Sequence, residues 1–276
     1  MGKLMSAGLS RLWKDKVFWI TAGAMLVFNL VNVFNGIRQT AWEMDAFGYT
    51  LDHYCFGFLP MFGTFAGAFI SLFLGTEYSD GTLRNKVIIG HTRVKVYFAS
   101  FLTSYIGSVT LLMTGFLAGM VGAPFLGWMQ LEASAILSYL LISLLMAGAW
   151  CALFTLIGML VANKAYSSVF CILFWLGFTF LGSYFYSALF EPETHAGALV
   201  TATGIVMGEP TPNPNYIGGF KRQVYEFLSD FFPSSQCIQM SNLEVVHPLR
   251  MMLSSLAITA TATLCGVLCF RKKDLK

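Results

Sequence analysis

Residues 77–98 read EYSDGTLRNKVIIGHTRVKVYF and form the most polar stretch of a very apolar chain. The stretch carries four basic side chains, two acids, two glycines and a histidine, and long hydrophobic runs adjoin it on both sides. Hydrophobic residues make up 56% of the 276 positions and charged residues only 11%, whereas soluble domains usually carry about a quarter charged residues. A water-soluble fold of this size could not bury so much apolar surface, so the sequence predicts a protein whose main solvent is lipid.

Six apolar runs approach or exceed the roughly 20 residues that a helix needs to cross the hydrocarbon core of a bilayer. They are 17–34, 55–75, 97–122, 133–162, 166–190 and 250–270. The first run follows a basic region, as in a signal peptide, but that region is too long and no small-x-small cleavage site follows. We therefore expect a single all-α membrane domain over residues 1–276, with six spanning helices.

Lysine and arginine placement predicts the orientation, because cytoplasmic loops of membrane proteins carry an excess of these residues. With the N-terminus inside, the inner segments 1–16, 76–96, 163–165 and 271–276 hold 13 of the 17 basic residues. The outer segments hold ten of the 14 acids. The number of spans and the charge asymmetry agree, so both termini are expected in the cytoplasm.

Two segments outside the apolar runs have amphipathic patterns. In 1–16, one helical face carries the apolar side chains of Leu4, Met5, Leu9, Leu12 and Trp13. This pattern suits a helix in the headgroup layer, although a frayed basic terminus is the alternative. The outer segment 191–249 holds six of the eight prolines, and its turn-rich part 208–219 should be irregular. Residues 221–236 predict a short amphipathic helix that ends near Pro233.

Residues 77–98 carry the signals of a short helix that lies crosswise between two spans. Glu77 closes the helix of the second span, and the short helix starts after it. Before TLRNKVII, Ser79 or Asp80 can cap a new helix. After it, Gly90 can end the helix, because helices often stop on a left-handed glycine. Thr92 can then cap the next span.

The side chains of this short helix should separate by character. Leu83, Val87 and Ile88 would share one side, while Arg84 and Lys86 would turn away. A loop made basic by the positive-inside rule is the alternative, but that rule explains the charges and not the two caps.

The residues of this segment resemble a known family of membrane proteins. The pattern E-x-x-x-G-T-L-R-N-K-x-x-x-G-x-x-R-x-K-x-Y at 77–97 resembles the loop after the second span of type-2 ABC transporter permeases, the membrane subunits of bacterial exporters whose ATPase is a separate chain. The N-terminal helix is similar to the elbow helix of that family. The stretch LSDFFPSSQ at 228–236 resembles its segment before the last span, and GVLCFRKKDLK at 266–276 resembles its usual terminus.

The resemblance implies a mechanism in which the crosswise helix is a coupling helix that docks in a groove of the ATPase. ATP-driven closure of two ATPase subunits would move two such helices, so a second permease subunit, identical or homologous, is expected. The implied ATPase-contacting residues are Glu77, Asp80, Gly81, Thr82, Leu83, Arg84, Lys86, Val87, Gly90 and Arg93. The expected location is the bacterial plasma membrane.

Motifs for catalysis are missing from the sequence. It has no Walker GxxxxGK[ST], no HExxH and no serine nucleophile elbow. We expect neither an enzyme nor a metal site in this chain, and we expect ATP and Mg²⁺ in the partner ATPase. The basic residues form short clusters at the ends of apolar runs, not one stripe, which argues against nucleic acid as a partner.

Polar and aromatic side chains within the spans are candidates for a substrate path. They are Asn29, Asn32, Thr64, Ser71, Thr103, Tyr105 and Tyr184. Packing or contact with lipid is the alternative role for each. Gly63 and Gly67 form a GxxxG pattern that favours a close helix crossing and can also serve dimerisation.

The sequence therefore predicts the permease subunit of an ATP-driven exporter. Its cargo would be hydrophobic or peptide-like, such as an antimicrobial peptide, a lipid or a drug, and some members of the resembled family confer resistance to membrane-active peptides. An ATP-independent transporter or a sensor scaffold is the alternative. The cysteines are expected to be small buried apolar residues, although Cys55 and Cys237 could both lie outside and form a disulfide.

Overall fold

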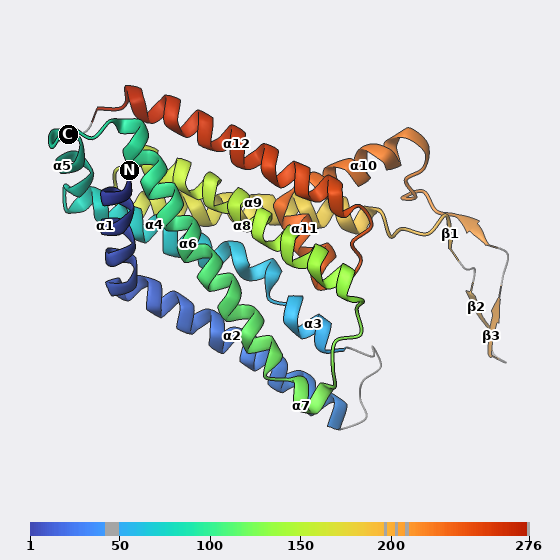
Figure 1. The fold of residues 1–276 in the computed structure, drawn as a ribbon. Helices are drawn as coiled ribbons and strands as arrows, with labels where there is room; N and C mark the ends of the chain where they lie inside the picture. Colours follow the sequence, from blue (N-terminus) through green and yellow to red (C-terminus); the bar gives the residue numbers. More distant parts are fainter. Residues whose placement is uncertain (42–49, 196–197, 202–203, 208–209, 275–276) are drawn as a thin grey trace.

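The computed structural model describes residues 1–41, 50–195, 198–201, 204–207 and 210–274. Within these residues, six helical segments are long and apolar enough to span a membrane, which confirms the prediction of an all-α membrane protein. They are α2 (Lys16–Ala41), α3 with α4 (Leu51–Phe56 and Leu59–Ser79), α6 (Arg93–Met120), α8 (Ala133–Leu160), α9 (Lys164–Ala188) and α12 (Pro248–Lys272). Figure 1 shows them as an elongated bundle.

Each observed span lies within a few residues of its predicted run, with two differences. The second span is interrupted at Gly57 and Phe58, and Pro60 lies in the first turn of α4, where its missing N–H costs no helical hydrogen bond. The first span continues past the predicted end at 34 to Gln39. Polar side chains in its last turns, such as Asn35, therefore stand on a helix and not in a loop.

Five shorter helices lie at the two ends of the bundle. Helices α1 (Gly2–Lys14) and α5 (Thr82–Ile88) lie at the same end as the C-terminal end of α12. Helices α7 (Ala123–Leu126), α10 (Gly219–Phe231) and α11 (Pro233–Ser241) lie toward the other end (Figure 1). Helix α10 ends where the sequence predicts, because Pro233 cannot continue it and instead starts α11.

Residues 191–249 contain two small strand pairs, and one of these strands, at Thr211–Pro212, lies within 208–219, so the expectation of irregular backbone in that stretch is wrong in part. Strand β1 (Thr194–His195) pairs antiparallel with β4 (Thr211–Pro212), and β2 (Ala198–Thr201) pairs antiparallel with β3 (Gly204–Met207). The β2–β3 pair is rich in valine, isoleucine and threonine, whose branched side chains favour extended backbone.

The core is centred on α8, which is apolar on all sides. In the most apolar window of each helix, 61% of the residues are buried in α8 but only 17% in α9, so α9 presents most of its surface to lipid or to another chain. Trp150 of α8 is buried and stacks on Phe154 with ring centroids 5.3 Å apart. A side chain at Gly63 would collide with Trp175, and one at Gly67 would press on Phe154. The GxxxG pattern thus serves packing of α4 on α8 and α9.

All six cysteines are free. Cys55 and Cys237 are both buried, and their sulfurs each lie 3.6 Å from a methionine sulfur, of Met120 and Met146 respectively. The disulfide considered between them is therefore not formed, because α3 and α11 carry the two thiols into separate contacts. The expectation of burial is also wrong for Cys265 and Cys269, which face outward from α12.

Candidate functional site

Helix α5 begins with a glycine and not with a capping side chain. Gly81 has a φ of +65°, a left-handed conformation that glycine adopts at little cost. Ser79 is the last residue of α4 and Asp80 is its C-cap, so the expectation that either would cap α5 is wrong. Two residues, Asp80 and Gly81, separate α4 from α5, and the left-handed backbone of the turn falls on the glycine. Thr82 secures the turn by donating to the carbonyl of Glu77 at 3.0 Å.

The other end of α5 agrees with the sequence. Gly90 has a φ of +100°, and its left-handed conformation ends the helix as predicted. Thr92 caps α6, because its hydroxyl accepts a hydrogen bond from the backbone N–H of Lys95 at 3.4 Å. Helix α5 is therefore held between two defined turns.

The two faces of α5 differ from the expected ones. Leu83 is buried with 1% exposure and Val87 is partly buried, but Ile88 is 68% exposed. Ile88 therefore does not share the buried side. Lys86 does not turn away either, because its Nζ lies 2.8 Å from a carboxylate oxygen of Glu77. A helix of two turns that packs back on α4 can bury only one narrow strip of side chains.

Glu77 is the hub of this end of the bundle. Its carboxylate is buried, and Oε1 lies 2.5 Å from Nη1 of Arg11 and 2.8 Å from Nζ of Lys86. Arg11 also donates from Nη2 to the carbonyl of Phe73 at 2.8 Å and lies over the ring of that residue. One carboxylate thus joins α1, α4 and α5, through an ion pair with Arg11 and a charge-assisted hydrogen bond from Lys86. Hydrogen bonds of this kind are stronger than neutral ones.

Arg93 connects α6 to the end of the last span. Its Nη1 donates to the backbone carbonyls of Phe270 at 3.2 Å and Arg271 at 3.1 Å, and also to that of Lys273. The last carbonyls of a helix have no partner within the helix and carry partial negative charge. Arg93 therefore caps α12 and is partly covered, so its expected contact with an ATPase would compete with this role.

Lys273 follows α12 and completes the same end. Its Nζ donates to the hydroxyl of Tyr78 at 2.9 Å and to the carbonyl of Met159 at 3.1 Å. The ammonium group also lies over the Tyr78 ring, 4.2 Å from its centroid. Burial lowers the pKa of Lys273 to about 8, because a poorly solvated ammonium group loses its proton more easily.

The surface that α5 leaves open is the candidate functional surface. It consists of Arg84, Ile88 and Ile89, called here the α5 tip, and Ile89 is 78% exposed. Figure 1 shows α5 at the extreme end of the bundle, beyond the ends of α4 and α6. Two adjacent isoleucines exposed outside the spans form the kind of apolar patch that marks a protein contact.

Two of the seven substrate-path candidates line one cavity. Asn29 and Asn32 face a cavity of about 510 Å³ between α2, the α3–α4 break and the end of α11. Asn29 is fully buried, and its amide nitrogen donates to the carbonyl of Gly115 at 2.7 Å.

The other five candidates line no cavity in common with these in the part of the chain that the structure describes. They are Thr64, Ser71, Thr103, Tyr105 and Tyr184. Thr103 donates to a carbonyl of its own helix at 2.8 Å, and Tyr105 donates to the carbonyl of Leu144 at 3.2 Å. Tyr184 is 58% exposed near the C-terminal end of α9. A substrate path lined by all seven residues therefore stays a prediction, because the described part of this chain does not bring them together around one cavity.

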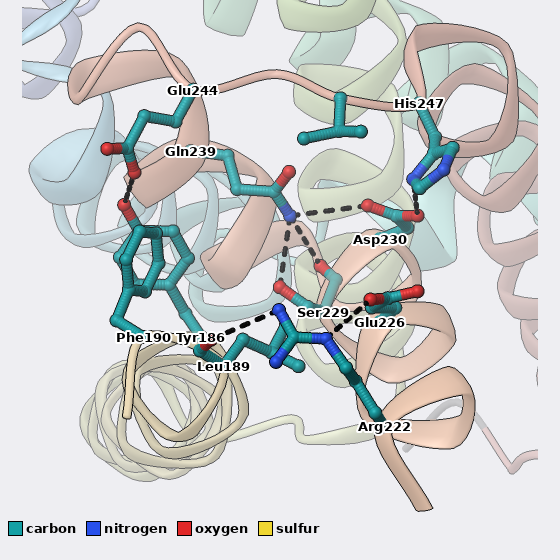
Figure 2. A pocket seen from close by; sticks show the side chains of 11 residues that line it. Tyr186, Leu189, Phe190, Arg222, Glu226, Ser229, Asp230, Gln239, Glu244 and His247 are labelled. Carbon is teal, nitrogen blue, oxygen red and sulfur yellow. Dashed lines mark hydrogen bonds and ion pairs between the residues drawn. The ribbon is translucent and has the colours of Figure 1, made fainter. Parts of the chain in front are cut away.

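The opposite end of the bundle holds a second buried carboxylate, which sequence reasoning missed. Asp230 of α10 lies 3.0 Å from Nη1 of Arg250 and 3.2 Å from Nδ1 of His247, and it accepts a hydrogen bond from Gln239 at 3.4 Å. Figure 2 shows it beside a cavity of about 430 Å³. Burial raises the pKa of Asp230, although these three partners act in the opposite direction.

The comparison with protein families agrees with this architecture. The family model described as "ABC-2 family transporter protein" matches residues 6–182, which extend from α1 into α9. No curated protein matches the chain.

Proposed function

Since the chain belongs to the ABC-2 family of transporter proteins, we propose that it is the permease subunit of an ATP-driven exporter and that α5 couples it to a separate ATPase. In this proposal two ATPase subunits bind ATP and Mg²⁺, and a second permease, identical or homologous, completes the pathway. The complex lies in a bacterial plasma membrane with both termini of this chain in the cytoplasm.

The α5 tip is the observation that carries the proposal. One side of α5 is anchored by buried Leu83 and by the pair between Lys86 and Glu77. The other side exposes Ile88 and Ile89. An anchored helix with an exposed apolar tip can enter a groove of a partner, and buried apolar anchors at the centre of an interface supply most of its binding energy.

The contacts at this end offer a route for force from the α5 tip into the spans. A push on α5 reaches α4 through Glu77 and reaches α1 through Arg11. Gly90 and Thr92 lead directly into α6, whose first residue, Arg93, holds the end of α12. The proposed coupling therefore acts on three spans and on the N-terminal helix together.

The proposed cargo is hydrophobic or peptide-like, which includes membrane-active peptides, lipids and drugs. Its support is the outward surface of α9, where Phe170, Leu173 and Phe180 are each more than half exposed. In a complex with a second permease, such a surface would form an apolar wall or a subunit contact.

The test replaces both exposed isoleucines, as Ile88→Asp with Ile89→Asp, in a tagged chain purified in mild detergent. We expect at least about a tenfold loss of the ATPase that co-purifies with the wild-type chain, because charges cannot enter an apolar groove without a large desolvation cost. Leu83→Asp is not used, because Leu83 is buried and its replacement would disturb folding.

Two controls accompany this variant. Val246→Asp places a charge at a residue that is 72% exposed at the other end of the bundle, and it should leave ATPase binding unchanged. Ile88→Leu with Ile89→Leu keeps the apolar tip and should retain binding. If the double aspartate variant binds the ATPase as well as the wild type does, α5 is not the coupling element. If no ATPase co-purifies with the wild-type chain, the exporter proposal is wrong.

A further inference from the structure

The cavity that contains Asn29 and Asn32 has an unusual wall for a membrane protein, because carboxamides supply much of it. Its polar lining consists of five carboxamides together with a histidine, a tyrosine and a serine: Asn29, Asn32, Asn35, Gln39, Asn242, His53, Tyr54 and Ser241. Among the described residues that line it there is no Asp, Glu, Lys or Arg. Carboxamides both donate and accept hydrogen bonds, so this wall suits a polar group that also does both and carries no charge.

The position of the cavity along α2 places it in the outer half of the membrane. Helix α2 begins at Lys16, at the predicted cytoplasmic face. A helix rises about 1.5 Å per residue, so Asn29 lies roughly 20 Å and Gln39 roughly 35 Å from that start. Since the hydrocarbon core is about 30 Å thick, the cavity extends from the outer leaflet into the outer headgroup layer.

Asn29 supplies an acceptor without a partner at the inner end of the cavity. Its Nδ2 donates to the carbonyl of Gly115 at 2.7 Å and to that of Tyr54 at 3.3 Å. Both partners are acceptors, so the nitrogen must face them and the orientation of the amide is settled. Its Oδ1 is buried and has no hydrogen-bond partner in the described part of the chain. A buried acceptor that stays unpaired costs free energy. A small shift of the surrounding side chains that brought a ligand hydroxyl or N–H to Oδ1 would remove that cost.

Apolar side chains beside the cavity indicate what else the ligand must carry. Phe28 and Met61 line it together with the amides. On the adjoining outward face of α2, Val31 and Phe34 are more than half exposed, as suits contact with lipid chains. A molecule with its head in the cavity can therefore keep its hydrocarbon tail in the bilayer beside α2.

We propose that this cavity binds the uncharged, hydroxyl-bearing head group of an amphiphile that enters from the outer leaflet. Among the described lining residues His53 is the one acidic or basic side chain, and its Nδ1 accepts the backbone N–H of Thr50 at 3.2 Å. The carboxamides and hydroxyls that make up the rest of the polar wall offer a charged head group no counter-ion, and burial of a charge without one is costly. A cavity of about 510 Å³ is within the range that holds a drug-sized ligand. Binding of the amphiphile is independent of the proposed function. The role of the amphiphile as cargo rests on the proposed exporter.

The test uses the full-length chain in phosphatidylcholine nanodiscs and needs no ATPase. The probe is a monoglucosyl diacylglycerol with a diazirine on its sugar, and the matched probe is a phosphatidylglycerol with a diazirine on its glycerol head. After illumination, mass spectrometry maps the labelled peptides. We expect the glucosyl probe to label peptides of α2, α3 and α11 at least about fivefold more than the anionic probe does.

The test variant is Asn32→Leu with Asn35→Leu, because neither side chain has a hydrogen bond in the described structure that folding would lose. Asn29 is left intact, since it joins α2 to the carbonyls of α3 and α6. We expect at least about a fivefold loss of glucosyl labelling at the cavity. The control, Thr261→Leu, makes an exposed residue of α12 apolar and should change nothing at the cavity.

Three outcomes would overturn the inference. They are equal labelling of the cavity by the neutral and anionic probes, labelling that the double leucine variant retains, and displacement of the glucosyl probe by a transmembrane polyleucine peptide that carries a diazirine and itself labels the cavity. The last outcome would assign the site to a peptide. Labelling is independent of the α5 variants, so a chain that binds the probe but no ATPase would retain the cavity site and lose the exporter function.

Discussion

The two ends of the molecule use the same device, a buried carboxylate between two basic side chains, for different tasks. The side chains of Glu77 and Asp230 are each only 4% exposed. The cations on Glu77 come from α1 and α5, two elements far apart in the sequence. The basic partners of Asp230, His247 and Arg250, both lie at the start of α12. One carboxylate therefore joins separate elements, while the other closes a single corner between α10, α11 and α12.

The two devices also differ in their contact with solvent. The partners of Glu77 are 26% and 23% exposed, whereas those of Asp230 are 38% and 41% exposed. Water and salt screen exposed charges, so pairs near the surface contribute little. We infer that the contacts of Glu77 contribute more to the free energy of unfolding than those of Asp230. Their loss should also disturb more of the helices.

The largest effect is expected for Glu77→Gln. The change leaves Arg11 and Lys86, both mostly covered, without their counter-charge. Removing one partner of a buried pair typically costs about 3 kcal/mol or more. We expect a clear fall in thermal stability in nanodiscs and weaker co-purification of an ATPase, because α5 loses one of its two anchors. The control for thermal stability is Asp80→Asn, which neutralises a neighbouring exposed acid; it is not used for ATPase binding, because Asp80 is itself an expected contact. A fall no larger than that of the control would contradict the role of Glu77 as a hub.

A smaller effect is expected for Asp230→Asn. Its two basic partners, His247 and Arg250, are about 40% exposed and can be solvated, so we expect a loss of stability of about 1 kcal/mol. Binding of an ATPase should not change, because the site lies at the far end of the bundle. Equal losses from Asp230→Asn and Glu77→Gln would remove the distinction between the two ends.

Titration of Lys273 at one end of the bundle and of Asp230 at the other should change stability with opposite signs. The change from Lys273 should be the larger. The pKa of Lys273 is lowered to about 8, whereas an unfolded lysine titrates near about 10.4. Between these values the unfolded chain holds more protons than the folded one, so stability rises with pH. We expect a gain of less than about 1 kcal/mol after screening. Melting curves from pH 7.5 to 9.5 should show this gain for the wild type and lack it for Lys273→Met.

The smallest effect is expected from the titration of Asp230. Its pKa is raised above the unfolded value of about 3.9, so in the range just above that value the folded chain holds more protons. The contribution of this group to stability therefore falls as pH rises through this range. His247, Arg250 and Gln239 all face the carboxylate, so the comparison is made between His247→Gln and His247→Gln with Asp230→Asn. A contribution that rises with pH there would contradict the assigned direction.

Sequence reasoning reached the spans and the limits of α5 because local signals determine both. Runs of about 20 apolar residues must become helices in lipid, where no other backbone conformation satisfies its own hydrogen bonds. Gly90 and Thr92 act on their immediate neighbours, so their roles could be read from the residues alone. The same reasoning failed for Ile88 and Lys86, because the orientation of these side chains depends on how the short helix α5 packs against α4.

What the sequence by itself determined is the membrane class, the number of spans and a short helix at residues 82–88, since these follow from hydrophobicity, length and backbone preference. Only the tertiary structure decided that Glu77 would meet Arg11, 66 positions earlier in the chain, and that Asp230 would meet the start of α12. It also decided that Asn29 and Asn32 would share a cavity with α11. Contacts of this kind depend on which faces of the helices pack together, and the pattern within one helix carries no record of its neighbours.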